Sequence, residues 1–217
     1  MSEPVYHPGL EGVVAGETAI STIAGGTGLG YRGYAIEDLA REASFEEVAY
    51  LILHGELPAT DALKDFCRRL AAAAPLQSEV LQFIRSVPRS TPIMDFMRTA
   101  ASALAHFDSE AADTSSEAQL RKAERLFAQL PTVLAAQRRI QQGKEPVAPD
   151  PQKSFAANML WMLRREDPSP QLEQAMDVSL TLYAEHEFNA STFTARVITS
   201  TLSDLHSSVA GAIGALK

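Results

Sequence analysis

The chain has 217 residues, with 19 basic and 27 acidic side chains and a formal net charge of −8 at pH 7. Apolar residues make up 46% and charged residues 21%, which is typical of a globular protein with a sizeable core and not of a disordered chain. The acidic balance argues against nucleic acid as the main partner, and no run of about 18 apolar residues is present that would span a membrane.

The N-terminal segment has neither the basic start nor the apolar core of a secretory signal. Cys67 is the only cysteine, so no intramolecular disulfide can form and a reducing compartment is the simpler assumption. Helical spacing of Cys67 with Leu63 and Leu70 favours a buried thiol over a nucleophile. We therefore expect a cytoplasmic protein.

The first 35 residues differ in pattern from the rest of the chain. Residues 12–23 are rich in β-branched side chains, and residues 24–36 are rich in glycine. This predicts two short extended segments joined by a turn. The run GGTGLG, Gly25 to Gly30, lacks the spacing of a dinucleotide fingerprint, and no Lys-Ser/Thr pair follows as in a phosphate loop. We interpret it as the hairpin turn.

Helix start and stop signals follow residue 35. Ser44 and Glu47 form a capping box before an apolar run that stops at Gly55. Thr60 is expected to cap the next helix, which ends by Pro75. Further helices are expected at about residues 78–87, 92–107, 153–165 and 170–186.

A long helical pattern runs from Ser116 to Gln142, with Pro131 expected to kink or break it. Together these patterns predict an all-α fold of about eight to ten helices with a short N-terminal β element. We expect residues 1–217 to form a single domain.

The last segment, residues 205–217, is rich in small residues that would let helix backbones approach closely. Its apolar stripe of Val209, Ile213 and Leu216 needs a surface to cover it. The pattern leaves open whether that surface is the core of the same chain or a second subunit.

No pair among the five histidines has the spacing of a metal site, so no metal is expected. His54 and His106 lie near predicted helix ends, where structural roles suffice. His7 lies near the N-terminus and His206 in the last segment.

His186 stands apart because it lies between Glu185 and Glu187, with Asn189 three residues on. We expect it at the end of a helix, on the same face as Tyr183. A structural histidine is one interpretation. The other is a polar cluster that binds a carboxylate or carbonyl, although the cluster by itself specifies no reaction.

Three stretches, Pro8–Ser21, Tyr31–Pro58 and Leu182–Asp204, resemble the citrate synthases, including the 2-methylcitrate synthases. The resemblance runs from about Pro8 to Lys217. It implies the multi-helix large domain of a citrate synthase, and a homodimer formed through helices that include Leu205–Lys217.

This resemblance implies a transferase that joins oxaloacetate and acetyl-CoA, with water, to give citrate and CoA. Acetyl-CoA would be a substrate, and no other cofactor is implied. His186 corresponds to a histidine that binds and orients oxaloacetate, and Asn189 would help to shape the same pocket. Arg139 is a candidate for contact with a CoA phosphate across a dimer.

The family's catalytic histidine segment, its catalytic aspartate and its small domain would follow Lys217, so no catalytic role is assigned to a residue of this chain. His206 is not a substitute, because it precedes that segment. We expect the N-terminal portion of a citrate synthase, inactive by itself. The alternatives are an inactive paralogue that acts as a dimerisation partner, a 2-methylcitrate synthase, and an enzyme split over two chains.

Overall fold

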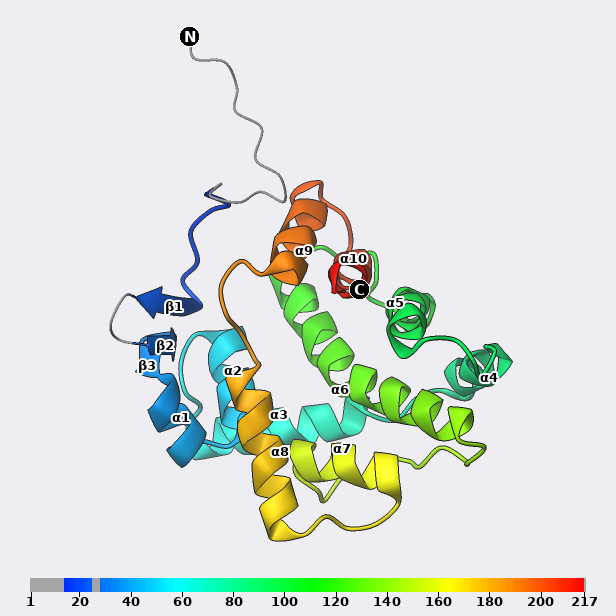
Figure 1. Ribbon diagram of the computed structural model, residues 1–217. Helices are drawn as coiled ribbons and strands as arrows, with labels where there is room; N and C mark the ends of the chain where they lie inside the picture. Colours follow the sequence, from blue (N-terminus) through cyan, green and yellow to red (C-terminus); the bar gives the residue numbers. More distant parts are fainter. Residues whose placement is uncertain (1–13, 25–27, 217) are drawn as a thin grey trace.

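The computed structural model describes residues 14–24 and 28–216, and ten α-helices follow a small β-sheet in this part of the chain (Figure 1). The predicted all-α fold with an N-terminal β element is confirmed. The helices are α1 (Ile36–Glu42), α2 (Phe45–His54), α3 (Thr60–Ala73), α4 (Ser78–Ser86), α5 (Ile93–Leu104), α6 (Ser116–Gln141), α7 (Phe155–Arg164), α8 (Pro170–Leu182), α9 (Ala190–Ser200) and α10 (Leu205–Ala215).

The sheet has three short antiparallel strands, β1 (Ser21–Ala24), β2 (Gly28–Tyr31) and β3 (Tyr34–Ala35), in that order. The two predicted extended segments are present as β1 and β2. Gly28 to Gly30, which were expected in the turn, are part of β2, and residues 25–27 lie outside the described residues. The first strand is shorter than its β-branched run predicted. Gly30 is required in β2, because a Cβ there would lie 2.9 Å from the carbonyl oxygen of Tyr34.

The capping box of α2 is present as predicted. The Ser44 hydroxyl accepts from the backbone N–H of Glu47, whose carboxylate accepts from the N–H of Ser44 at 2.8 Å. Gly55 ends the helix in the left-handed conformation, with φ 96°. The cap expected at Thr60 is wrong: Ala59 is the capping residue and Thr60 is the first helical residue, without a side-chain cap.

Helix α6 crosses the middle of the molecule without a break (Figure 1), so a break at Pro131 is wrong. Proline removes one helical hydrogen bond, but burial of the turns on both sides of it offsets that cost. Ala128, Thr132 and Val133 are all buried against neighbouring helices.

Three clusters of buried side chains form the core. The largest joins α4, α5 and α6 around Phe96, which is 1% exposed. A second joins β2, α1 and α2 around Tyr31, and a third joins α2, α3 and α6 around Phe66. The first lies on the side of α4 and α5, and the second at the opposite edge beside the sheet (Figure 1).

Helix α10 packs on α5 and α9 of the same chain. Val209 and Ile213 lie against the largest core cluster, which supports the core interpretation for these two residues. Helices α9 and α10 approach closely: a Cβ at Gly211 would lie 2.2 Å from Cδ1 of Ile198. Leu216 is 59% exposed, so the stripe is not fully covered. None of the helices described here is long and apolar enough to cross a bilayer.

Candidate functional site

His186 lies in the loop of residues 183–189 that connects α8 to α9, with its side chain exposed. The expectation that it belongs to a helix is wrong, because α8 ends at Leu182 and Tyr183 is its C-terminal cap. The loop carries a left-handed residue, Glu187, with φ 66°, which turns the chain away from the helix axis. An exposed imidazole on a loop is open to a ligand, which a packed helical histidine would not be.

Tyr31 anchors the start of this loop from the opposite end of the sequence. Its side chain is fully buried, and its hydroxyl lies 3.0 Å from the carbonyl oxygens of Thr181 and Glu185, to either of which it can donate. The same hydroxyl accepts from the N–H of Glu185 at 3.3 Å. Burial raises the pKa of Tyr31, so the hydroxyl keeps the proton that it donates.

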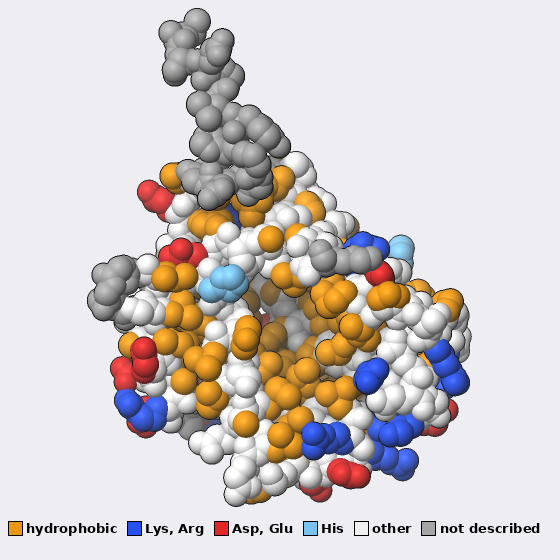
Figure 2. Space-filling view, in the orientation of Figure 1, with side chains coloured by type: hydrophobic (Ala, Val, Ile, Leu, Met, Phe, Trp, Pro, Cys, Tyr) orange, Lys and Arg blue, Asp and Glu red, His pale blue; other side chains and the backbone are white. Residues whose placement is uncertain are grey.

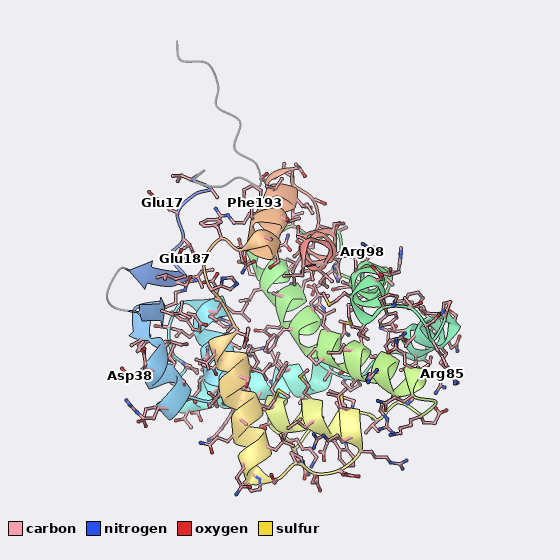
Figure 3. All side chains as sticks on the ribbon, in the orientation of Figure 1. Glu17, Asp38, Arg85, Arg98, Glu187 and Phe193 are labelled. Atoms are coloured by element: carbon pink, nitrogen blue, oxygen red, sulfur yellow. The ribbon has the colours of Figure 1, made fainter. Side chains whose placement is uncertain are left out.

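Strand β1 holds the second half of the loop through Glu187. The N–H of Glu187 donates to the Ser21 hydroxyl at 2.9 Å, and its carboxylate accepts from the N–H of Ile23 at 3.0 Å. Figure 3 shows Glu187 beside β1. The Glu185 carboxylate also accepts from the Glu187 N–H, at 2.9 Å. The two glutamates therefore bind backbone, and among the described residues no ion pair joins either of them to His186.

Asn189 is the N-terminal cap of α9. Its side-chain oxygen accepts from the N–H of Thr192 at 2.8 Å and from the hydroxyl of Ser191. This fixes the start of α9 three residues after His186. The N-terminus of a helix favours negative charge, so the loop offers an anion both a helix end and an imidazole.

Arg196 adds a cation on α9. Its guanidinium lies 4.8 Å above the ring of Phe188, the residue between Glu187 and Asn189. The loop is thus positioned from two sides, by the β element and by α9. The sequence had not pointed to Tyr31, Ser21 or Arg196. Tyr31 and Ser21 bind residues more than 100 positions away, and Arg196 meets Phe188 only because of the way the loop turns.

Arg139 does not fit the role expected for it. The residue is 4% exposed, and its guanidinium donates to the carbonyl oxygens of Glu145 at 2.6 Å and Leu163 at 3.2 Å. These bonds tie the end of α6 to the following loop and to α7. Contact with a phosphate across a dimer is therefore wrong for this side chain.

The remaining sequence candidates fall outside the loop. Cys67 is half-buried, not fully buried as expected, and burial raises its thiol pKa, which disfavours the thiolate nucleophile. His54 ends α2 as predicted and stacks on Tyr50 with ring centres 4.0 Å apart. His106 is exposed in a 3₁₀ turn (Ala105–Phe107), and His7 lies outside the described residues.

His206 is buried at the start of α10. Its Nε2 lies 3.5 Å from the Asp108 carboxylate, and burial lowers its pKa despite that neighbour. The described residues contain no group of three or more His, Cys, Asp or Glu side chains that could hold a metal ion.

Comparisons with known proteins agree on one family. The family described as "Citrate synthase, C-terminal domain" matches residues 9–217. The chain is 46% identical over 215 residues to a citrate synthase of Mycolicibacterium smegmatis, and 48% identical over 215 residues to 2-methylcitrate synthase 2 of Corynebacterium glutamicum. These alignments cover 99% and 96% of this chain, but only 57% and 56% of the relatives.

Comparison with solved structures indicates the same family. Citrate synthase from Pyrobaculum aerophilum superposes with a TM-score of 0.91 at 40% identity, covering 96% of this chain and 54% of that one. A Thermoplasma acidophilum citrate synthase, described as a ternary complex with carboxymethyl coenzyme A and oxaloacetate, superposes with a TM-score of 0.90 at 29% identity. That superposition covers 97% of this chain and 55% of the other. The chain thus spans a little over half the length of the relatives it matches.

Proposed function

This chain belongs to the citrate synthase family, and from that premise we propose that it takes part in joining oxaloacetate to acetyl-CoA to give citrate and CoA. The role fits a transferase of the tricarboxylic acid cycle in the cytoplasm. No metal and no cofactor other than the substrate acetyl-CoA is part of the proposal.

The observation that carries the proposal is the exposed His186 on a loop anchored at both ends. We assign His186 to oxaloacetate, as the family resemblance implies. An imidazole that donates a hydrogen bond can polarise the substrate carbonyl or bind one of its carboxylates. Asn189 contributes by fixing the N-terminus of α9, whose dipole also favours a dianion.

Proton NMR tests this assignment directly, because the chain has only five histidines. Oxaloacetate is expected to shift the ring signals of His186, identified by their absence in His186→Gln. Succinate, the same four-carbon dicarboxylate without the keto group, serves as the control for carbonyl recognition. His106 is also exposed but lies in a different part of the chain. Equal shifts of its ring signals would indicate non-specific binding and contradict the assignment.

The proposal has two versions, which differ in the acyl donor. Identities of 46% to a citrate synthase and 48% to a 2-methylcitrate synthase do not separate acetyl-CoA from propionyl-CoA. We propose acetyl-CoA first and propionyl-CoA as the alternative. The test uses an antibody against residues 37–48 to remove the protein from extracts of the source cells. With oxaloacetate present, the treated extract should release less CoA from one of the two donors. Unchanged release from both would count against an enzymatic role.

No catalytic base is assigned within residues 1–217. Enol formation from acetyl-CoA needs a carboxylate base and a donor to the thioester oxygen, and the resemblance places both after Lys217. We therefore expect the 217-residue polypeptide, assayed alone, to release no CoA above background. Measurable turnover by the pure chain would overturn this expectation.

The second candidate function is that of a dimerisation partner without catalysis, which would use the exposed surface of α9 and α10. Among the described residues of these two helices, only His206 and Ser208 are buried. Val197 of α9 is 48% exposed, and Leu216, which follows α10, is 59% exposed. We propose that this surface forms a homodimer. Sedimentation of Val197→Glu should then show a lower dimer fraction than wild type, and a monomeric wild type would refute the homodimer.

A further inference from the structure

Arg32 lies in a tight turn where an arginine is unfavourable. Tyr31 of β2 pairs with Tyr34 of β3, so the turn between the two strands has only two residues. These are Arg32 and Gly33, and both have positive φ, 50° and 90°, as a type I′ hairpin turn requires. Asparagine and glycine adopt such angles readily, whereas other side chains are strained there. Strain of this kind is found most often at residues that have a function.

The guanidinium of Arg32 connects two segments that are separate in the chain. Its Nη2 donates to the carbonyl oxygen of Ile52, in the last turn of α2, at 3.2 Å, and its Nη1 donates to that of Ala19, two residues before β1, at 3.3 Å. The last carbonyl groups of a helix have no partner within the helix, and the helix dipole favours a cation beside them. Arg32 therefore links the residues ahead of β1 to the C-terminus of α2.

The backbone of Arg32 adds a third bond to the same segment. Its N–H donates to the carbonyl oxygen of Ile20 at 2.8 Å, one residue before β1. Helix α2 is fixed in the core, because Val48 and Leu51 are fully buried in the cluster around Tyr31. In addition to the pairing of β1 with β2, a single residue thus ties the start of β1 to a helix of the core.

Strand β1 in turn holds the loop of His186. The Ser21 hydroxyl accepts from the N–H of Glu187 at 2.9 Å, and the N–H of Ile23 donates to the Glu187 carboxylate at 3.0 Å. The loop lies at the rim of the hollowed, mainly hydrophobic centre of the face in Figure 2. Since Glu187 directly follows His186, a displacement of β1 would also displace the imidazole at this rim.

A second contact joins the segment before β1 to the loop. A Cβ built on Gly16 would lie 3.3 Å from the ring of Phe188, so these two residues pack against each other. Ala19, to which Arg32 donates, lies between Gly16 and β1 in the chain. Residues on both sides of the Arg32 contact therefore touch the loop.

We propose that Arg32 is a positioning residue for oxaloacetate: it fixes β1 on α2, and β1 places the loop that presents His186. This role rests on the proposed binding of oxaloacetate by His186. If the turn alone mattered, asparagine would serve better than arginine, because type I′ turns favour Asn-Gly. Replacement of Arg32 by asparagine therefore separates the effect of the turn from that of the guanidinium.

Hydrogen exchange of Arg32→Asn tests the link without a ligand. Asparagine suits the turn, but its side chain is too short to reach both carbonyl oxygens. The amides of Ile23 and Glu187 should exchange at least about fivefold faster than in the wild-type chain, the factor for one hydrogen bond lost, while those of α6 should not change. Arg41→Gln, at an arginine of α1 whose side chain is 65% exposed, is the matched control and should leave these rates unchanged.

Oxaloacetate binding gives a readout that a general loss of stability would not move. Half of the full shift of the His186 ring signals should require about five- to tenfold more oxaloacetate in Arg32→Asn than in the wild-type chain, because the imidazole is no longer held in place. Unresponsive His186 signals in the wild-type chain would contradict oxaloacetate binding by His186, and with it this role of Arg32. Faster exchange in Arg32→Asn would then still show that Arg32 holds the loop.

The proposal is overturned if Ile23 and Glu187 exchange at wild-type rates in Arg32→Asn, because the turn alone would then hold β1. It is also overturned if the wild-type chain binds oxaloacetate and Arg32→Asn binds it equally well. If Arg32→Asn fails to fold by circular dichroism, Arg32→Gly serves instead with the same expected results, because glycine adopts positive φ without strain.

Discussion

The helices around α6 and the loop that carries His186 are held by different interactions. Around α6, buried apolar side chains from α4, α5 and α6 pack together with half-buried ones from α10, and burial of hydrocarbon supplies the stability. The loop instead depends on hydrogen bonds: the Tyr31 hydroxyl donates to backbone carbonyls of the loop and of the end of α8, and the Ser21 hydroxyl accepts from the N–H of Glu187. Many combinations of apolar side chains can fill a core, whereas these hydrogen bonds hold one backbone segment in one position. The difference suggests that changes around α6 act on stability and changes at the β element act on the loop.

The largest effect is expected from Phe96→Ala. Phe96 is 1% exposed in the largest cluster and lies against Phe83, with ring centres 6.2 Å apart. Its loss should lower the free energy of unfolding by about 3–5 kcal/mol, measured by urea denaturation. Tyr183→Ala, at a side chain 88% exposed, is the control and should change it by less than about 0.5 kcal/mol. Equal losses would abolish the distinction between core and loop.

Tyr31→Phe is expected to lower the free energy of unfolding less than Phe96→Ala does, but to increase the mobility of the loop more. Without the hydroxyl, the carbonyls of Thr181 and Glu185 lose the one proton that either can accept, and the N–H of Glu185 loses its acceptor, at a cost of about 1–3 kcal/mol. Hydrogen exchange of residues 183–189 should accelerate more than that of α6. Tyr34→Phe, at a side chain 43% exposed, is the matched control. Unchanged exchange in the loop would show that Tyr31 does not anchor it.

Ser21→Ala removes a single bond to the loop and should cost about 0.5–1 kcal/mol. The effect is small because the Glu187 N–H retains the Glu185 carboxylate as an acceptor at 2.9 Å. Hydrogen exchange at Glu187 is the measurement. Thr22→Ala, an exposed neighbour on β1, should leave it unchanged. A loss equal to that of Tyr31→Phe would show that both anchors act as one unit.

The smallest effect on stability is expected from replacing His206 at the start of α10, and only at acidic pH. Burial lowers the pKa of its imidazole, with Lys122 and Arg125 adding to the lowering and Asp108 and Asp204 opposing it. The unfolded chain therefore binds a proton below about pH 6.5 that the folded chain does not. Stability from the neutral imidazole is present above that pH and is lost as the pH falls below it.

His206→Gln should show a smaller loss of thermal stability between about pH 7 and pH 5 than the wild-type chain. His106→Gln, at an exposed histidine, is the control and should follow the wild type. An identical pH profile in both variants would exclude His206 as a source of acid sensitivity.

Local signals predicted most of the helices. The capping box at Ser44 and the glycine at 55 act within one turn, so the sequence suffices to read them. Two local predictions were wrong. Packing on both sides keeps α6 continuous through Pro131. Helix α3 begins at Thr60 with Ala59 as its cap, so Thr60 lies one position too late to cap it.

The amino-acid sequence was enough to predict the fold class and the family, because helix periodicity and the resembling stretches are formed by residues that are close together in the chain. It was not enough to show that His186 lies on a loop, that Glu187 binds β1 and that Arg139 is buried. Tyr31 and Thr181 are 150 positions apart, and their hydrogen bond forms only after the β element has packed on α8. No local pattern encodes such a contact, since it depends on how distant elements meet.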